Sequence, residues 1–105
     1  MPNSEKLALF IERVVNINVL RMGGASAGII GASGTDNIVL NNLKKSTVDF
    51  AREYSKPNSS QLELAGLSQD IYGYLRTLQV TYTLSEEEVD ELMDELQALM
   101  NKPSD

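Results

Sequence analysis

The chain contains no cysteine, no histidine and no tryptophan. Without cysteine it has no disulfide framework, no thiolate nucleophile and no zinc–thiolate site. Without histidine it lacks the side chain that most often serves as a general base and as a transition-metal ligand. We therefore expect a protein that is not an enzyme and that holds no cofactor or metal, because catalysis would rest on carboxylates, lysine, tyrosine or serine alone.

Long apolar runs are also missing from the sequence. No stretch approaches the roughly 20 apolar residues that a helix needs to cross a bilayer. The N-terminal segment "MPNSEKLALF" has an early glutamate and no basic region before an apolar run, which is unlike a secretory signal peptide. We expect a cytoplasmic protein without a membrane span.

Basic residues are few, and the excess of negative charge is concentrated in one part of the chain. The sequence has 9 lysines and arginines against 15 aspartates and glutamates, a formal net charge of −6. Residues 85–105 carry eight of the acidic side chains and one lysine, which leaves seven acidic and eight basic side chains in the first 84 residues. Because phosphate contacts need clustered lysine and arginine, we expect no nucleic-acid partner.

Four segments have apolar residues at the three- and four-residue spacing of a helix. They cover residues 4–22, 35–55, 60–82 and 85–101. The length of 105 residues fits a single domain, 1–105. We predict an all-α fold, a small and mostly antiparallel four-helix bundle. A three-helix bundle with an irregular glycine-rich segment is the alternative, and "VVNINVL" in the first segment also alternates as a strand does.

Helix start signals support these boundaries. Ser4 is a plausible N-cap for the first helix. Ser60 with Glu63, and Ser85 with Glu88, have the spacing of a capping box, in which each side chain bonds the backbone N–H of the other residue. The second of these motifs begins the acidic C-terminal helix, 85–101.

Apolar stripes on the first and last helices point to a partner. The last helix has an apolar stripe at heptad spacing whose methionines suit an adaptable interface. The first helix has two apolar stripes, which indicates burial on two sides. The predicted partner interface consists of Val89, Leu92, Met93, Leu96, Leu99 and Met100 from the last helix and Val15 and Val19 from the first.

Acidic side chains occupy the rest of the last helix. Glu86, Asp90 and Asp94 form one row at four-residue spacing, and Glu87, Glu91 and Glu95 form a second. A solvated helix face is the simplest interpretation of such a charge run. A basic partner, a hard cation, or internal pairing with Lys44, Lys45 and Arg52 are the alternatives.

The stretch "GGASAGIIGASG", residues 23–34, holds five of the seven glycines. It lacks the lysine of a phosphate-binding P-loop and the spacing of a dinucleotide fingerprint. A flexible connection over 23–35 is one interpretation. Close packing of small faces is another, because Gly66 and Gly73 repeat the seven-residue spacing of the two "GAS" triplets. A ligand loop is a third, and it would consist of Gly28, Gly31, Ser33, Gly34 and Thr35.

These observations favour a non-enzymatic protein–protein interaction module. The doubled apolar stripes, the methionines and the asymmetric charge suit a homo-oligomer that docks another protein, as an adaptor, antitoxin, chaperone or inhibitor does. The alternative is a protein that binds a small ligand or nucleotide phosphate with the glycine-rich segment and its tyrosines. The sequence does not choose among the partners.

Overall fold

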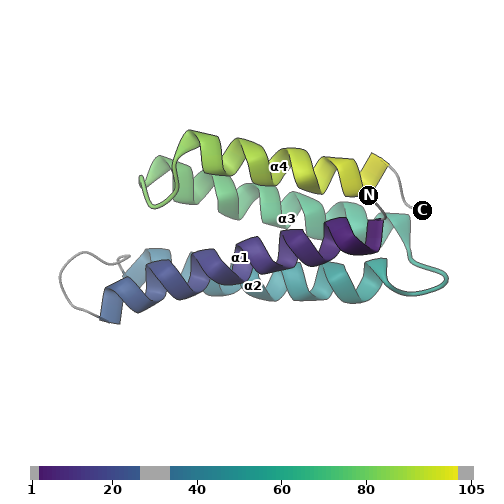
Figure 1. Cartoon of the computed structure of the whole chain (residues 1–105), viewed down its shortest axis with the longest axis horizontal. Coiled ribbons are helices and arrows are strands. Elements are labelled where there is room, and N and C mark those ends of the chain that lie inside the picture. Colours follow the sequence, from purple (N-terminus) through teal and green to yellow (C-terminus); the bar gives the residue numbers. More distant parts are fainter. Residues whose placement is uncertain (1–2, 27–33, 102–105) are drawn as a thin grey trace.

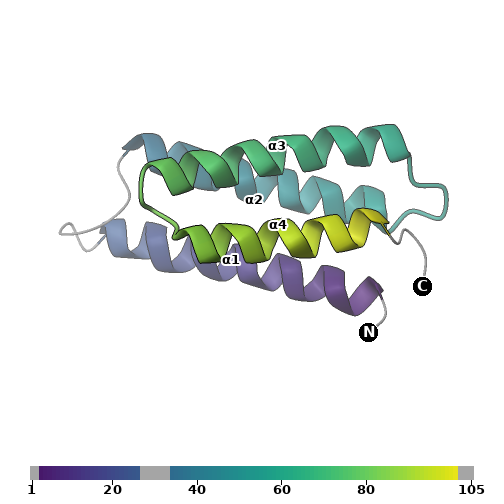
Figure 2. The ribbon, with the colours of Figure 1, turned by 90° about the horizontal axis from the view of Figure 1, so that it is seen from above.

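The structure, a computed structural model, describes residues 3–26 and 34–101, with the side chains of 3–20 and 37–101. It contains four helices: α1 (Asn3–Ser26), α2 (Gly34–Tyr54), α3 (Gln61–Val80) and α4 (Glu86–Asn101). The helices run alternately up and down, and each contacts the next in chain order while α4 also contacts α1. Figures 1 and 2 show this closed ring from two directions, which confirms the predicted all-α four-helix bundle.

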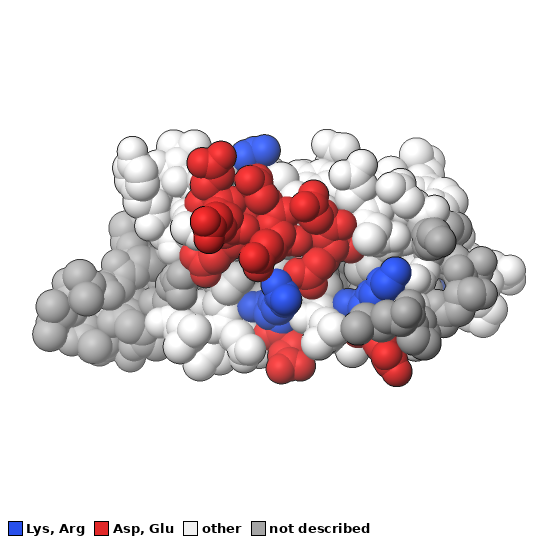
Figure 3. Space-filling model, turned by 45° about the horizontal axis from the view of Figure 1, so that its top comes forward, with Lys and Arg blue, Asp and Glu red and all other residues white. Residues whose placement is uncertain are grey.

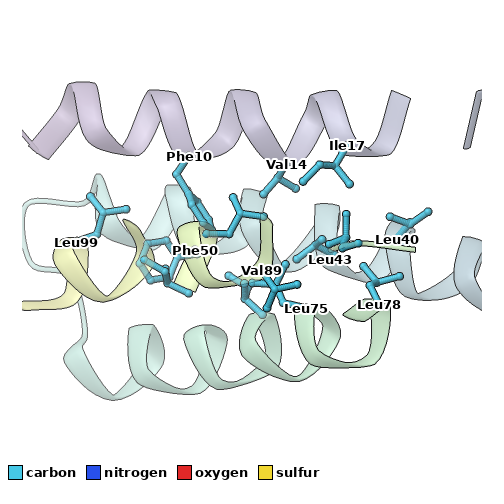
Figure 4. Close-up of a cluster of buried hydrophobic side chains, with 14 of the residues drawn as sticks. Phe10, Val14, Ile17, Leu40, Leu43, Phe50, Leu75, Leu78, Val89 and Leu99 are labelled. Atoms are coloured by element: carbon cyan, nitrogen blue, oxygen red, sulfur yellow. The ribbon is translucent and has the colours of Figure 1, made fainter. Parts of the chain in front are cut away.

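One apolar core fills the centre of the ring, and all four helices contribute to it (Figure 4). The predicted periodicity is confirmed, because the residues at three- and four-residue steps are the ones that face inward. The buried apolar residues are Leu7, Phe10, Val14, Ile17, Leu40, Leu43, Phe50, Leu64, Ile71, Leu75, Leu78, Leu84, Val89, Leu92, Leu96 and Leu99. Burial of a side chain of this size contributes about 1.5–3 kcal/mol, so this core is the main source of stability.

The C-terminal helix begins as predicted. Ser85 Oγ accepts a hydrogen bond from Glu88 N (3.1 Å), and Glu88 Oε1 accepts one from Ser85 N (3.0 Å). Both halves of the capping box are therefore formed. The glutamates of the first turn also lie at the positive end of the helix dipole.

The start of α3 departs from the predicted capping box. Ser60 Oγ accepts from Glu63 N (3.2 Å), but Ser60 N donates to Glu53 Oε2 (2.8 Å). Glu53 at the end of α2 thus takes the place that Glu63 would occupy, and it also pairs with Lys56 Nζ (3.0 Å). One carboxylate therefore holds both ends of the α2–α3 turn.

Two other predicted boundaries differ from the structure, by four residues at the end of the first helix and by two at the end of the third. The first helix starts at Asn3 and continues to Ser26, so Ser4 lies inside it and Gly23 and Gly24 are helical. The third helix ends at Val80, because Tyr82 has a left-handed backbone (φ 62°). Such a residue closes a helix as a C-terminal glycine does, and the amide nitrogens of the next two residues then donate to Leu78 O.

Among the described residues, hydrogen bonds of buried or half-buried groups join the helices at two places. Tyr54 O–H of α2 donates to Leu99 O of α4 (2.9 Å) and accepts from Asn3 Nδ2 of α1 (2.8 Å), which ties three helices together at one end. Nearer the other end, the buried amide Nδ2 of Asn18 donates to Leu40 O (3.1 Å) of α2. These bonds supplement the apolar contacts of the core.

Candidate functional site

The apolar stripe of α4 faces the interior of its own bundle. Val89, Leu92, Leu96 and Leu99 are fully or almost fully buried in the core. The prediction that these four residues contact a partner is corrected, because a bundle of this size needs the apolar face of every helix for its own core. Figure 4 shows Val89 of α4 beside Leu75 of α3 in this core.

The remaining residues of the predicted interface are more accessible. Met93 and Met100 of α4 are half-buried and pack against the edge of the core. Val15 of α1 is also half-buried, whereas Val19 is 64% exposed. The structure therefore does not bring the eight predicted residues together on one outer face.

The structure tests only part of the predictions made for the glycines. Gly28, Gly31 and Ser33 lie outside the described residues, and Gly34 and Thr35 lie in the first turn of α2. Gly66 and Gly73 lie on the exposed face of α3, where an added Cβ would meet nothing within 4 Å. Close packing within the chain does not explain these two glycines.

Acidic side chains cover one face of the molecule along α4 (Figure 3). The basic residues Lys44, Lys45 and Arg52 are exposed on α2, which lies diagonally across the ring from α4, so within the described residues they do not pair with these acidic side chains. The basic partner is Arg13 of α1, whose Nη1 lies 3.2 Å from Glu91 Oε2 and 2.9 Å from Glu95 Oε2. Sequence reasoning missed Arg13, although it lies beside the apolar stripe of α1, where a long side chain can reach a neighbouring helix.

A groove runs between α1 and α4, and Arg13 crosses it. On one side of Arg13 is a hollow of about 490 Å³, and on the other is a hollow of about 280 Å³. Both hollows are lined by Arg13 and Glu91, so they adjoin at this ion pair. The other lining residues are Lys6, Leu9, Asp94, Glu95 and Ala98 in the larger hollow and Asn16, Ile17, Glu88 and Leu92 in the smaller. We call the two hollows together the α1–α4 groove.

The charges in the α1–α4 groove are not balanced. Glu95 is the more buried of the two carboxylates that Arg13 contacts, with 28% of its side chain exposed against 66% for Glu91. Burial raises the pKa of Glu95 above its ordinary value; the Arg13 charge opposes this shift, and the Glu91 charge adds to it. The guanidinium therefore compensates only part of the cost of holding Glu95 ionised.

A shallower hollow of about 480 Å³ lies between α3 and α4. Tyr72, Gly73, Arg76 and Met93 line it together with two glutamines. Burial raises the pKa of the Tyr72 hydroxyl, and the Asp94 carboxylate adds to the shift. This hollow mixes amide and aromatic groups and carries less charge than the α1–α4 groove.

Beyond these hollows, the described residues form neither a metal site nor a membrane-spanning helix. Within residues 3–26 and 34–101, no group of three or more aspartate or glutamate side chains is arranged so that it could hold a metal ion. Over the same ranges, the structure has no helix that is both long enough and apolar enough to cross a membrane. Comparison with protein-family models, with curated proteins and with solved structures found no match to this chain.

Proposed function

We propose that the chain is a non-enzymatic protein–protein interaction module and that the α1–α4 groove is its docking site. One observation carries the proposal: the groove combines an apolar floor with an acidic rim on the face where the excess charge of the molecule is concentrated. Leu9 and Ala98 contribute apolar surface to the larger hollow, and Ile17 and Leu92 contribute it to the smaller. An apolar centre with a polar rim is the usual anatomy of a protein interface.

Site-specific photo-crosslinking in cells that make the protein tests this proposal. A photoreactive phenylalanine analogue at Leu9, in the α1–α4 groove, should give a discrete crosslinked protein. The same analogue at Ile38, which is exposed on α2 and belongs to neither proposed interaction surface, is the matched control. The groove is not the docking site if the two positions give the same products, or if Leu9 gives none.

Self-association is the second part of the proposal, and it would use a different surface, the exposed face of α3. Leu62 and Val80 are 86% and 75% exposed on α3, and Gly66 and Gly73 lie between them on the same helical face. Two α3 helices can approach closely there because the glycines carry no side chains. The acidic face of α4, in contrast, would repel a second copy of itself.

The oligomeric mass, measured by light scattering after gel filtration, tests self-association. Wild-type chain should have the mass of an oligomer, and Leu62→Glu should lower the mass toward that of the monomer. Leu9→Glu is the control in the α1–α4 groove and should leave the mass unchanged. A monomeric wild type would remove this part of the proposal and leave the docking of another protein intact.

Binding of a small ligand stays the alternative function. A ligand that binds only the folded chain raises its melting temperature by mass action. A thermal-shift series with ATP, GTP and inorganic phosphate should leave the melting temperature unchanged under the interaction proposal. A concentration-dependent rise with any of these compounds would favour the alternative.

A further inference from the structure

We infer that the α1–α4 groove takes a basic amphipathic helix, and that Arg13 occupies, in the free chain, the place of a lysine or arginine of that helix. This inference rests on the proposed function and names the partner of the same site. It follows from the length of the groove, from the charges on its rim and from the position of Arg13 between its two hollows.

The dimensions of the groove fit a helix of about three turns. On α1 its lining runs from Lys6 to Ile17, a rise of about 16 Å at 1.5 Å per residue. On α4 the lining runs from Glu88 to Ala98, a similar length. Apolar residues occur along this length on both helices, as the apolar side of a docked helix requires.

The rim selects a basic partner. Glu88, Glu91, Asp94 and Glu95 line the groove from α4, whereas Lys6 and Arg13 line it from α1. Four carboxylates against two cations leave a net negative rim. A second copy that presented its own acidic α4 would meet like charge, whereas lysine or arginine in the partner would meet opposite charge.

Arg13 shows what this rim binds. Its guanidinium contacts two carboxylates, Glu91 and Glu95, that lie four residues and one helical turn apart. Arg13 and Glu91 are 51% and 66% exposed, whereas Glu95 is 28% exposed. The exposed pair with Glu91 stabilises the fold by only about 0.2–1 kcal/mol, and a partner's cation would compensate the charge of Glu95 in place of Arg13. A cation from a partner can therefore replace Arg13 at little cost, and the two hollows then join into one continuous groove.

Fluorescence anisotropy with a designed peptide tests the inference. The probe is a fluorescein-labelled 14-residue helix of leucine and lysine, with its leucine–glutamate counterpart as the charge control. The lysine peptide should bind the wild-type chain, and the glutamate peptide should not. The variant Arg13→Gln removes the charge of Arg13 and its contacts, and it should tighten binding of the lysine peptide by about 1.4- to five-fold, the range that 0.2–1 kcal/mol corresponds to.

Two further variants separate displacement of Arg13 from a general charge effect. Lys45→Gln removes the same charge from the exposed face of α2 and, in 0.15 M salt, should change the dissociation constant less than Arg13→Gln does. The double variant Glu91→Gln, Glu95→Gln should weaken binding of the lysine peptide. If Arg13→Gln fails to fold, Arg13→Lys retains the charge on a shorter side chain and should tighten binding by a smaller factor.

The inference is overturned if Arg13→Gln binds the lysine peptide no more tightly than Lys45→Gln does, or if both peptides bind equally well. It is also overturned if the wild-type chain ignores the lysine peptide while Leu9 still crosslinks to a cellular protein; the proposed function would then survive with a different partner. Loss of the Leu9 crosslink as well would remove the proposed function itself.

Discussion

The α2–α3 side and the α1–α4 side of this bundle are built differently. Helices α2 and α3 make the most extensive interhelix contact, and both bury small hydroxyl side chains that bond within their own helix, as Thr47 does to Leu43 O and Ser68 to Ala65 O. Helices α1 and α4 are separated by hollows and joined by the Arg13 ion pairs. Close packing gives stability on one side, and incomplete packing leaves surface for a partner on the other.

The strongest test of this contrast compares a core leucine with a groove leucine. Leu96 of α4 is fully buried, whereas Leu9 in the α1–α4 groove is 42% exposed. Leu96→Ala should lower the free energy of unfolding by about 2–5 kcal/mol, because it removes buried methyl groups and leaves a cavity. Leu9→Ala should change it by no more than about 0.5 kcal/mol. Urea denaturation followed by circular dichroism measures both, and equal losses would contradict the contrast.

The hydroxyl of Tyr54 gives the next largest effect. Tyr54→Phe removes the bonds to Leu99 O and Asn3 Nδ2 and should lower the free energy of unfolding by about 1–3 kcal/mol, because buried polar groups lose a partner. Tyr82→Phe is the control, since Tyr82 is almost fully exposed. A loss for Tyr54→Phe that is no greater than the loss for the control would show that this hydroxyl does not tie the helices together.

Glu53, on the α2–α3 side, should stabilise the fold in its ionised form. Its bond from Ser60 N, and then its pairing with Lys56, hold its pKa below the ordinary value. A carboxyl group with a lowered pKa in the folded state contributes stability above its unfolded pKa, and that contribution is lost as the pH falls through the folded pKa. Glu53→Gln should therefore destabilise the chain at pH 7 and lose its effect in acid.

Denaturation midpoints of Glu53→Gln across pH 3–7 measure this prediction. Glu63→Gln is the matched control, because Glu63 is exposed in the first turn of α3. If the difference between Glu53→Gln and the wild type persists unchanged at pH 3, ionisation of Glu53 is not the source of the stability.

Glu95, on the α1–α4 side, should give a smaller effect with the opposite sign. Burial raises the pKa of Glu95 in the folded state. The stability that protonated Glu95 contributes is therefore complete below its unfolded pKa and is lost as the pH rises through its folded pKa. Glu95→Gln should therefore leave stability at pH 7 unchanged or slightly increased, by no more than about 0.5 kcal/mol for a carboxyl group that is only partly buried and is paired with Arg13. A clear loss at pH 7 in the same midpoint measurement would show that Arg13 compensates Glu95 fully.

The sequence predicts the fold better than it predicts the site. Helical periodicity and the Ser85–Glu88 capping box are local signals, and the structure confirms both. Periodicity cannot say what covers an apolar stripe, so Leu92 and Leu96 were assigned to a partner although the chain buries them itself. Arg13 pairs with residues 78 and 82 positions away, and only the order of helices around the ring brings them together.

Asn18 has a consequence for the uniqueness of the fold. A core dominated by leucine tolerates some repacking, so its apolar contacts specify the alignment of two helices less strictly than a polar contact does. If α1 slid along α2 by one turn, about 5.4 Å, Asn18 would move away from Leu40 O, and its buried amide would keep only the longer bond to Val14 O of its own helix. Asn18 thus favours the observed alignment of α1 on α2.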